Sequence, residues 1–135
     1  MTRIMRYSTP TTNEQSSLVS TLLDGGRLRI YTDPVPDSAD HSPADADLLL
    51  ELQFDSPAFD APVGGIITAH PLPPGYAMTT GRATWYRDLQ QDGTTVFDGT
   101  VGLASDNPNL VLDQVDLQQG ALVTIQGFQY TSPQQ

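Results

Sequence analysis

The sequence contains no cysteine among its 135 residues. Disulfide bonds and thiolate metal ligands are therefore excluded. No apolar run approaches the ~20 residues that span a bilayer, and residues 1–6 are not followed by the apolar stretch of a signal peptide. We expect a protein without a membrane span or signal peptide, synthesised in the cytoplasm and stabilised by packing and hydrogen bonds.

Lysine is also absent, so six arginines provide all of the positive side chains other than histidine. They are opposed by sixteen acidic residues, which gives a formal net charge of −10. A charge of this sign repels a phosphate backbone, and no basic stripe is interleaved with aromatic residues. We therefore expect protein partners and no direct binding of nucleic acid.

Glutamate is scarce, because only Glu14 and Glu51 accompany fourteen aspartates. Aspartate disfavours helix interiors and favours turns, since its short carboxylate bonds to nearby backbone N–H groups. Eleven glycines and eleven prolines point the same way. The composition predicts a turn-rich chain, and its length fits one domain.

One short helix is predicted near the N-terminus, after an extended arm at residues 1–10. Thr11 and Glu14 match a capping box, in which the hydroxyl accepts an N–H and the carboxylate reaches back. Residues 24–26 supply glycine for the left-handed residue that ends many helices. The apolar stripe expected to face the core is Leu18, Val19, Leu22 and Leu23.

After the helix, apolar residues alternate with polar ones, which is the period of a strand with one wet face. The clearest hairpin joins residues 83–88 to residues 94–101, with Asp92-Gly93 supplying the positive-φ turn. The other predicted strands are residues 27–32, 48–54, 66–67, 110–112, 115–117 and 121–130. The expected fold is mainly β, with a single-domain antiparallel sandwich or barrel of about seven or eight short strands over residues 11–132.

Residues 33–47 form the longest predicted loop, with three prolines, five aspartates and no apolar period. A loop of this length in a compact domain is a candidate contact region. Its aspartates favour a solvated acidic loop, and the alternative is a calcium site that matches no EF-hand. A second proline-rich segment, residues 71–75, is predicted to cross the surface as a stiff connection.

No set of residues matches a catalytic template. His41 and His70 both fall in predicted loops, and a triad cannot be built from the sequential neighbours of His41. The glycine pairs do not open a helix as a phosphate loop does. We predict no catalytic, cofactor-binding or metal-binding residues, and hence no enzyme.

Two groups of residues are candidates for contact with partners. The arm supplies apolar and basic side chains that become ordered only when something holds them. The arginines either pair with aspartates of the same chain or bind carboxylates of a neighbouring subunit through their planar fork. The candidates are Ile4, Met5, Arg6, Tyr7, Arg27, Arg29, Arg82 and Arg87.

Several of these segments together resemble small β-rich virion structural proteins of tailed bacteriophages. The resemblance covers residues 6–132: Arg-Tyr-Ser-Thr at residues 6–9, the capped helix, the proline-aspartate loop and the leucine-rich residues 48–52. Its most specific parts are Gly-Gly-Arg-Leu-Arg-Ile-Tyr at residues 25–31 and Asp-Gly-Thr-Thr-Val-Phe-Asp-Gly-Thr-Val-Gly at residues 92–102. The prolines of residues 71–75 and the strong acidity depart from the pattern.

The resemblance implies a cement or decoration protein on the capsid exterior, in contact with the major capsid protein and with copies of itself, possibly as a trimer. It carries over no catalytic residue and no cofactor. One alternative places the domain in the neck, tail or receptor-binding apparatus. Another is a carbohydrate-binding module that uses Trp85 as a stacking platform, although mid-hairpin placement favours a core position for that residue.

Overall fold

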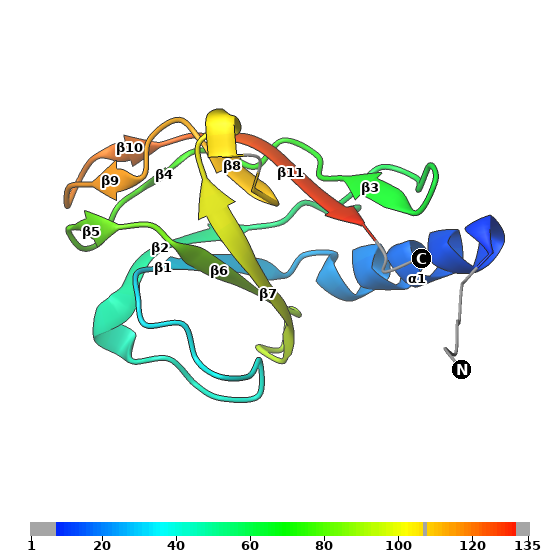
Figure 1. Cartoon of the computed structure of the whole chain (residues 1–135), viewed down its shortest axis with the longest axis horizontal. Helices are drawn as coiled ribbons and strands as arrows, with labels where there is room; N and C mark the ends of the chain where they lie inside the picture. The colour runs from blue at the N-terminus through cyan, green and yellow to red at the C-terminus, as the bar shows by residue number, and fades with distance from the viewer. Residues whose placement is uncertain (1–7, 107, 132–135) are drawn as a thin grey trace, which may run out of the picture.

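A computed structural model of the chain describes residues 8–106 and 108–131. One helix, α1, is followed by strands that build a curled, seven-stranded sheet of half-barrel shape and two small sheets (Figure 1). The mainly β fold with an N-terminal helix is thereby confirmed. The described elements are α1 (Thr9–Leu23), β1 (Arg27–Tyr31), β2 (Leu48–Gln53), β3 (Ile66–Thr68), β4 (Gly75–Tyr76), β5 (Gly81–Arg82), β6 (Trp85–Leu89), β7 (Thr95–Gly102), β8 (Leu110–Leu112), β9 (Asp116–Leu117), β10 (Leu122–Val123) and β11 (Ile125–Thr131), with short 3₁₀ helices at Asp45–Asp47 and Ala104–Asp106.

The large sheet has the strand order β2-β1-β6-β7-β8-β11-β3, and strands β4 with β10 and β5 with β9 form the two small sheets. The small sheets lie together at the end of the molecule opposite α1 (Figure 1). One pair departs from the antiparallel prediction, because β7 and β8 run parallel over two residue pairs. Strand β8 begins beside the last two residues of β7, so only the ends of these strands overlap.

The hydrophobic core fills the concave side of the large sheet. Phe54, Phe59 and Phe128 contact one another with ring centroids 5.6–5.9 Å apart, and Tyr86 meets Phe128 edge to face at 5.2 Å. Aromatic rings in offset or edge-to-face contact stabilise a core beyond the area they bury. Leucine and isoleucine side chains from β1, β2, β3 and β8 complete the cluster.

The helix corrects two predictions. It begins at Thr9, because Ser8 is the N-cap and its Oγ accepts the Thr11 N–H at 3.3 Å, so the last two residues of the predicted arm are helical. Its buried side matches the predicted stripe only in part. Leu23 is buried and Val19 packs against the core, whereas Leu18 is 59 % exposed and the other buried residues of the helix are Thr12 and Ser16.

Polar bonds to the turn before β3 explain this rotation of the helix. The Ser16 hydroxyl donates to the Gly65 carbonyl at 2.5 Å, and the Gly65 N–H donates to Asn13 Oδ1 at 2.8 Å. These bonds satisfy buried backbone groups that would otherwise be costly. Among the described residues, no helix is long and apolar enough to cross a membrane.

The hairpin of β6 and β7 has the predicted turn. Gly93 has φ 93°, and the Gln90 N–H donates to the Thr94 carbonyl at 2.8 Å. In the register of this hairpin, Trp85 lies opposite Thr100 and Tyr86 opposite Gly99.

Gly26 marks a close approach between the end of α1 and strand β6. A β-carbon at this position would overlap the Leu89 carbonyl oxygen and lie 3.0 Å from the Leu23 carbonyl oxygen. We expect Gly26→Ala to lower the free energy of unfolding, measured by urea denaturation, by about 1–3 kcal/mol. The added methyl group would clash with backbone atoms, which cannot move aside as a flexible side chain can. Gly127→Ala is the control, since a β-carbon there meets nothing within 4 Å. Equal losses in both variants would contradict this account of Gly26.

Candidate interaction surface

Three of the four candidate arginines pair with carboxylates at the surface. Arg29 Nε lies 2.9 Å from Glu51 Oε2, and Arg27 Nε lies 3.5 Å from the other oxygen of Glu51. Arg82 Nη1 lies 3.2 Å from Asp116 Oδ1, with both side chains mostly exposed. Exposed pairs of this kind add little stability and remain accessible to a partner.

Arg87 lies in a different environment, because only 4 % of the residue is exposed. Its Nε and Nη2 donate to the two carboxylate oxygens of Asp98 at 2.7 and 3.0 Å. Nη1 donates to the His41 carbonyl at 2.6 Å, and Nη2 also donates to the Ser38 carbonyl at 3.4 Å. The guanidinium therefore fastens residues 33–47 to the sheet and has no free side to offer a partner in this conformation.

The fastened loop covers the convex side of β1 and β6. Beneath it Trp85 stacks on Tyr31 with ring centroids 4.6 Å apart, and its Nε1 donates to the Thr32 carbonyl at 3.0 Å. Arg87 lies over the same indole at 5.4 Å. The core position predicted for Trp85 is confirmed as burial, although the indole lies on the opposite side of the sheet from the main cluster.

The other predicted contact residues belong to the N-terminal arm, and the other predicted site is the calcium alternative in residues 33–47. Ile4, Met5, Arg6 and Tyr7 lie outside the described residues. Within residues 8–106 and 108–131, no three His, Cys, Asp or Glu side chains gather closely enough to hold a metal ion. The aspartates of residues 33–47 therefore form no such cluster for calcium.

A further surface, which no single-residue motif indicates, is defined by its lack of charge. Residues 61–81 and residues 117–131 contain no Asp, Glu, Lys or Arg, in a chain with a net charge of −10. The fold places these two segments side by side. Strand β3 pairs with β11, β4 pairs with β10, and the Ala69 N–H donates to the Phe128 carbonyl at 2.9 Å. We call this surface the charge-free band.

The charge-free band runs along the length of the molecule, from β3 through β11 to β10 and β4 (Figure 1). It also concentrates apolar exposure. Of the eight large hydrophobic side chains that are exposed in the described residues, five belong to it: Val63, Ile66, Tyr76, Met78 and Leu122. Tyr76 is 66 % exposed, and its cross-strand neighbour Leu122 is 47 % exposed. Depletion of charge together with exposed Tyr and Met is the composition of a protein interface.

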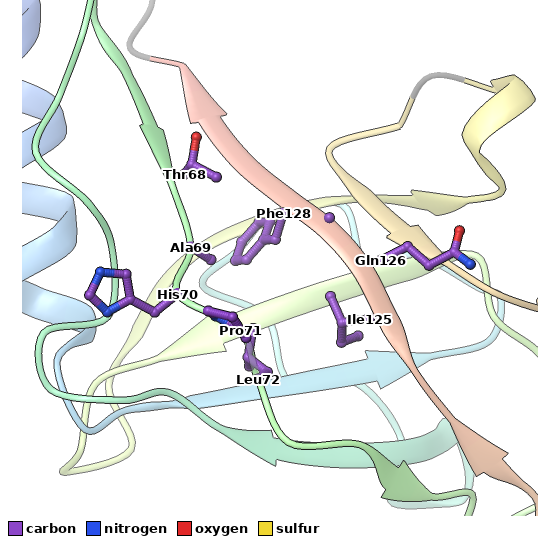
Figure 2. Close-up of a pocket in the computed structure, with 9 residues that line it drawn as sticks. Thr68, Ala69, His70, Pro71, Leu72, Ile125, Gln126 and Phe128 are labelled. Atoms are coloured by element: carbon purple, nitrogen blue, oxygen red, sulfur yellow. The ribbon is translucent and has the colours of Figure 1, made fainter.

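A shallow depression of about 190 Å³ opens between the two segments of the band. Figure 2 shows Ile125 and Phe128 extending from β11 toward the segment that carries Ala69 and Leu72, while Gln126 points away. The lining is mostly apolar, so the depression suits an apolar side chain better than a charged ligand.

Charged residues mark the rim of the band. Asp60, whose Oδ1 lies 2.6 Å from Nε2 of His70 in the band, marks one side, and the Arg82–Asp116 pair flanks the small sheets. Asp113 Oδ1 accepts the Thr124 N–H at 3.2 Å beside β10. An apolar interior within a polar rim is the usual anatomy of a contact surface between proteins.

One acidic residue is deeply buried in the sheet. Asp88 on β6 is fully buried, and neither carboxylate oxygen has a hydrogen-bond partner among the described residues. Burial raises the pKa of Asp88 well above its usual range, and the charge of Asp98 adds to the effect. Burial also raises the pKa of the Tyr86 hydroxyl, which has no hydrogen-bond partner in the described part of the chain.

Comparison of the chain with protein-family models finds no match. The curated protein sequences and the solved structures likewise contain no match. The physical features of the surface therefore carry the functional argument.

The charge-free band has a visible sequence signature, although single-residue motifs do not reveal it. Residues 61–81 and 117–135 are stretches of 21 and 19 residues without a charged side chain, which is unusual in a chain that is 16 % charged. The strand pairing that joins them connects residues about 60 positions apart, as in Thr68 with Gln129. The lack of charge marks both halves of the band in the sequence. Only the structure shows that the two halves are in contact.

Proposed function

We propose that the protein is a non-enzymatic structural component of a tailed-phage particle. In this role it acts as a cement or decoration protein that stabilises the head by contact with the major capsid protein and with copies of itself. The observation that carries the proposal is the charge-free band, because its exposed apolar residues and missing charges suit contact between proteins. The resemblance of the sequence to virion structural proteins is the reason for proposing a phage particle as the setting.

The fastening of residues 33–47 supports a structural role. Arg87 holds this loop through two of its backbone carbonyls, those of Ser38 and His41, and Trp85 bonds the carbonyl of Thr32 just before the loop. A loop that is fixed in advance loses little conformational entropy when a partner binds next to it. Such preorganisation suits a protein whose purpose is to hold neighbours in place.

The structure agrees with one of the two alternative functions better than with the other. A place in the neck, tail or receptor-binding apparatus uses the same kind of protein contact and differs only in location. A carbohydrate-binding module that stacks a sugar on Trp85 lacks its platform, because the indole is buried beneath Tyr31 and the loop. The capsid proposal is therefore retained ahead of the module.

Mass spectrometry of purified phage particles tests the proposal. We expect peptides of this chain in washed particles, in an amount comparable to the major capsid protein, and at the head surface in a particle reconstruction. Heads that lack the chain are expected to rupture at a lower temperature than complete heads. Density at the tail would favour the neck or tail alternative, and absence of the chain from particles would end the virion proposal.

A further inference from the structure

We infer that the charge-free band is the surface through which two copies of this chain contact each other. The inference names the partner of the surface described above, and it rests on the proposed function only for the setting in which the copies meet. Its physical grounds are the distribution of charge, the chemistry of the side chains and the shape of the band.

Charge distribution restricts how two copies can approach. Each copy carries a formal net charge of −10, so most relative orientations bring aspartates of one copy toward aspartates of the other. Like charges brought together across an interface cost several kcal/mol. Residues 61–81 and 117–131 carry no acid, so a contact made through the band keeps the acidic residues at its rim and beyond.

Side-chain chemistry makes the band complementary to itself. Its exposed polar residues are glutamines and threonines, as in the pair of Gln129 with Thr68 on β11 and β3. Amide and hydroxyl side chains both donate and accept hydrogen bonds, whereas a carboxylate only accepts and a guanidinium only donates. Since a two-fold contact places the same patch on both sides, a surface of dual donors and acceptors can satisfy itself.

The band also has exposed apolar side chains and an apolar hollow. The Val63–Ile66 turn projects with Val63 78 % exposed, and Tyr76 with Leu122 projects from the small sheet. Between these projections lies the depression of about 190 Å³ lined by Leu72 and Ile125. Apolar groups that fill apolar hollows supply most of the energy of protein contacts.

The band makes up a large share of the chain. A stable interface covers roughly 800 Å² on each partner. That is about a tenth of the 7846 Å² surface of this chain, and the band includes 36 of its 135 residues.

Sedimentation velocity of the full chain over a concentration series tests the inference. We expect reversible association of the wild-type chain. Leu122→Asp and Gln129→Asp add a charge to the band and are expected to weaken association at least tenfold, because the new carboxylate is desolvated beside its own copy. The matched controls are Leu18→Asp and Val35→Asp, which add the same charge at residues that are exposed and outside the band. Circular dichroism establishes that each variant is folded.

Salt provides a second measurement. Raising the ionic strength from about 0.05 M to about 0.5 M screens the mutual repulsion of the acidic copies and leaves an apolar contact in place, so association should strengthen. A contact made of ion pairs would weaken instead, and that result would overturn the inference.

The outcomes separate this inference from the proposed function. A wild-type chain that stays monomeric at every concentration, or control variants that weaken association as much as the band variants, would overturn the self-contact. Protection of the band by capsid protein alone would assign it to that partner and leave the virion proposal standing. Conversely, a chain that is missing from particles but self-associates through the band would end the virion proposal and leave this inference intact.

Discussion

Replacing Arg87 with methionine is expected to lower the free energy of unfolding by about 3–5 kcal/mol, the usual cost of removing one partner from a buried ion pair. The variant leaves the Asp98 carboxylate mostly buried without its two hydrogen bonds. It also releases the carbonyls of His41 and Ser38, so residues 33–47 lose two of their attachments to the sheet. Urea denaturation measures the loss of stability.

The control for this variant is Arg82→Met, which removes an ion pair of the same chemistry from the surface. Arg82 and Asp116 are both mostly exposed, and exposed pairs are worth about 0–1 kcal/mol. Hydrogen exchange adds a local readout, because amides of residues 38–41 should lose protection in Arg87→Met alone. Similar losses of stability in the two variants would show that Arg87 does not fasten the loop.

The wild-type protein is expected to lose stability as the pH rises, because of Asp88. Replacing Asp88 with asparagine should remove this loss. An unfolded aspartate titrates near pH 3.9, whereas burial raises the pKa of folded Asp88 well above that value. The folded state therefore holds the proton more tightly. Its contribution to stability is complete below about pH 3.9 and is lost as the pH rises through the folded-state pKa, by at most about 1.4 kcal/mol per pH unit for one proton.

Asparagine does not ionise, so Asp88→Asn should gain stability relative to the wild type as the pH rises. Urea denaturation at several values from about pH 4 to about pH 9 measures the difference between the two proteins, which cancels the titration of all other groups. Asp116→Asn, at an exposed position, is the control and should follow the wild-type curve. Parallel curves for Asp88→Asn and wild type would mean that the Asp88 carboxyl does not titrate abnormally.

Local chemistry made part of the fold predictable. Gly93 sits in the turn that Asp92-Gly93 predicts, and Gly25 takes φ 68° after the helix as its sequence indicates. Arg27 to Tyr31 forms the first strand, with Leu28 and Ile30 buried as their alternation predicts. In each case the residues that determine the structure are neighbours in the chain, so the pattern contains the information.

Long-range contacts account for what the sequence did not reveal. The helix turns Ser16 toward the sheet because Gly65, 49 residues away, accepts its hydroxyl, and no period within the helix records that bond. Arg87 was expected either to pair within the chain or to face a partner, and the answer depends on Asp98 and on a loop 46 residues upstream. The charge-free band likewise needs two distant segments to pair before it becomes one surface.

The number of strands also depends on long-range pairing. The structure has eleven strands in its described part, whereas about seven or eight were expected. The unpredicted strands Gly75–Tyr76 and Gly81–Arg82 contain two residues each, and they are strands because they pair with Leu122–Val123 and Asp116–Leu117. A two-residue segment has no measurable period, so its partner must be known before it can be recognised.

Labelling of a single introduced cysteine is the most direct test of the charge-free band as a contact between copies. The chain contains no cysteine, so maleimide would react only at the introduced residue. A single cysteine introduced as Leu122→Cys lies within the band, and Leu18→Cys lies outside it at a residue that is 59 % exposed. The rate of maleimide labelling is then measured for each variant at low and at high protein concentration. We predict that labelling at position 122 slows as concentration rises while labelling at position 18 does not change. Equal rates at position 122 across the concentration range would contradict the account.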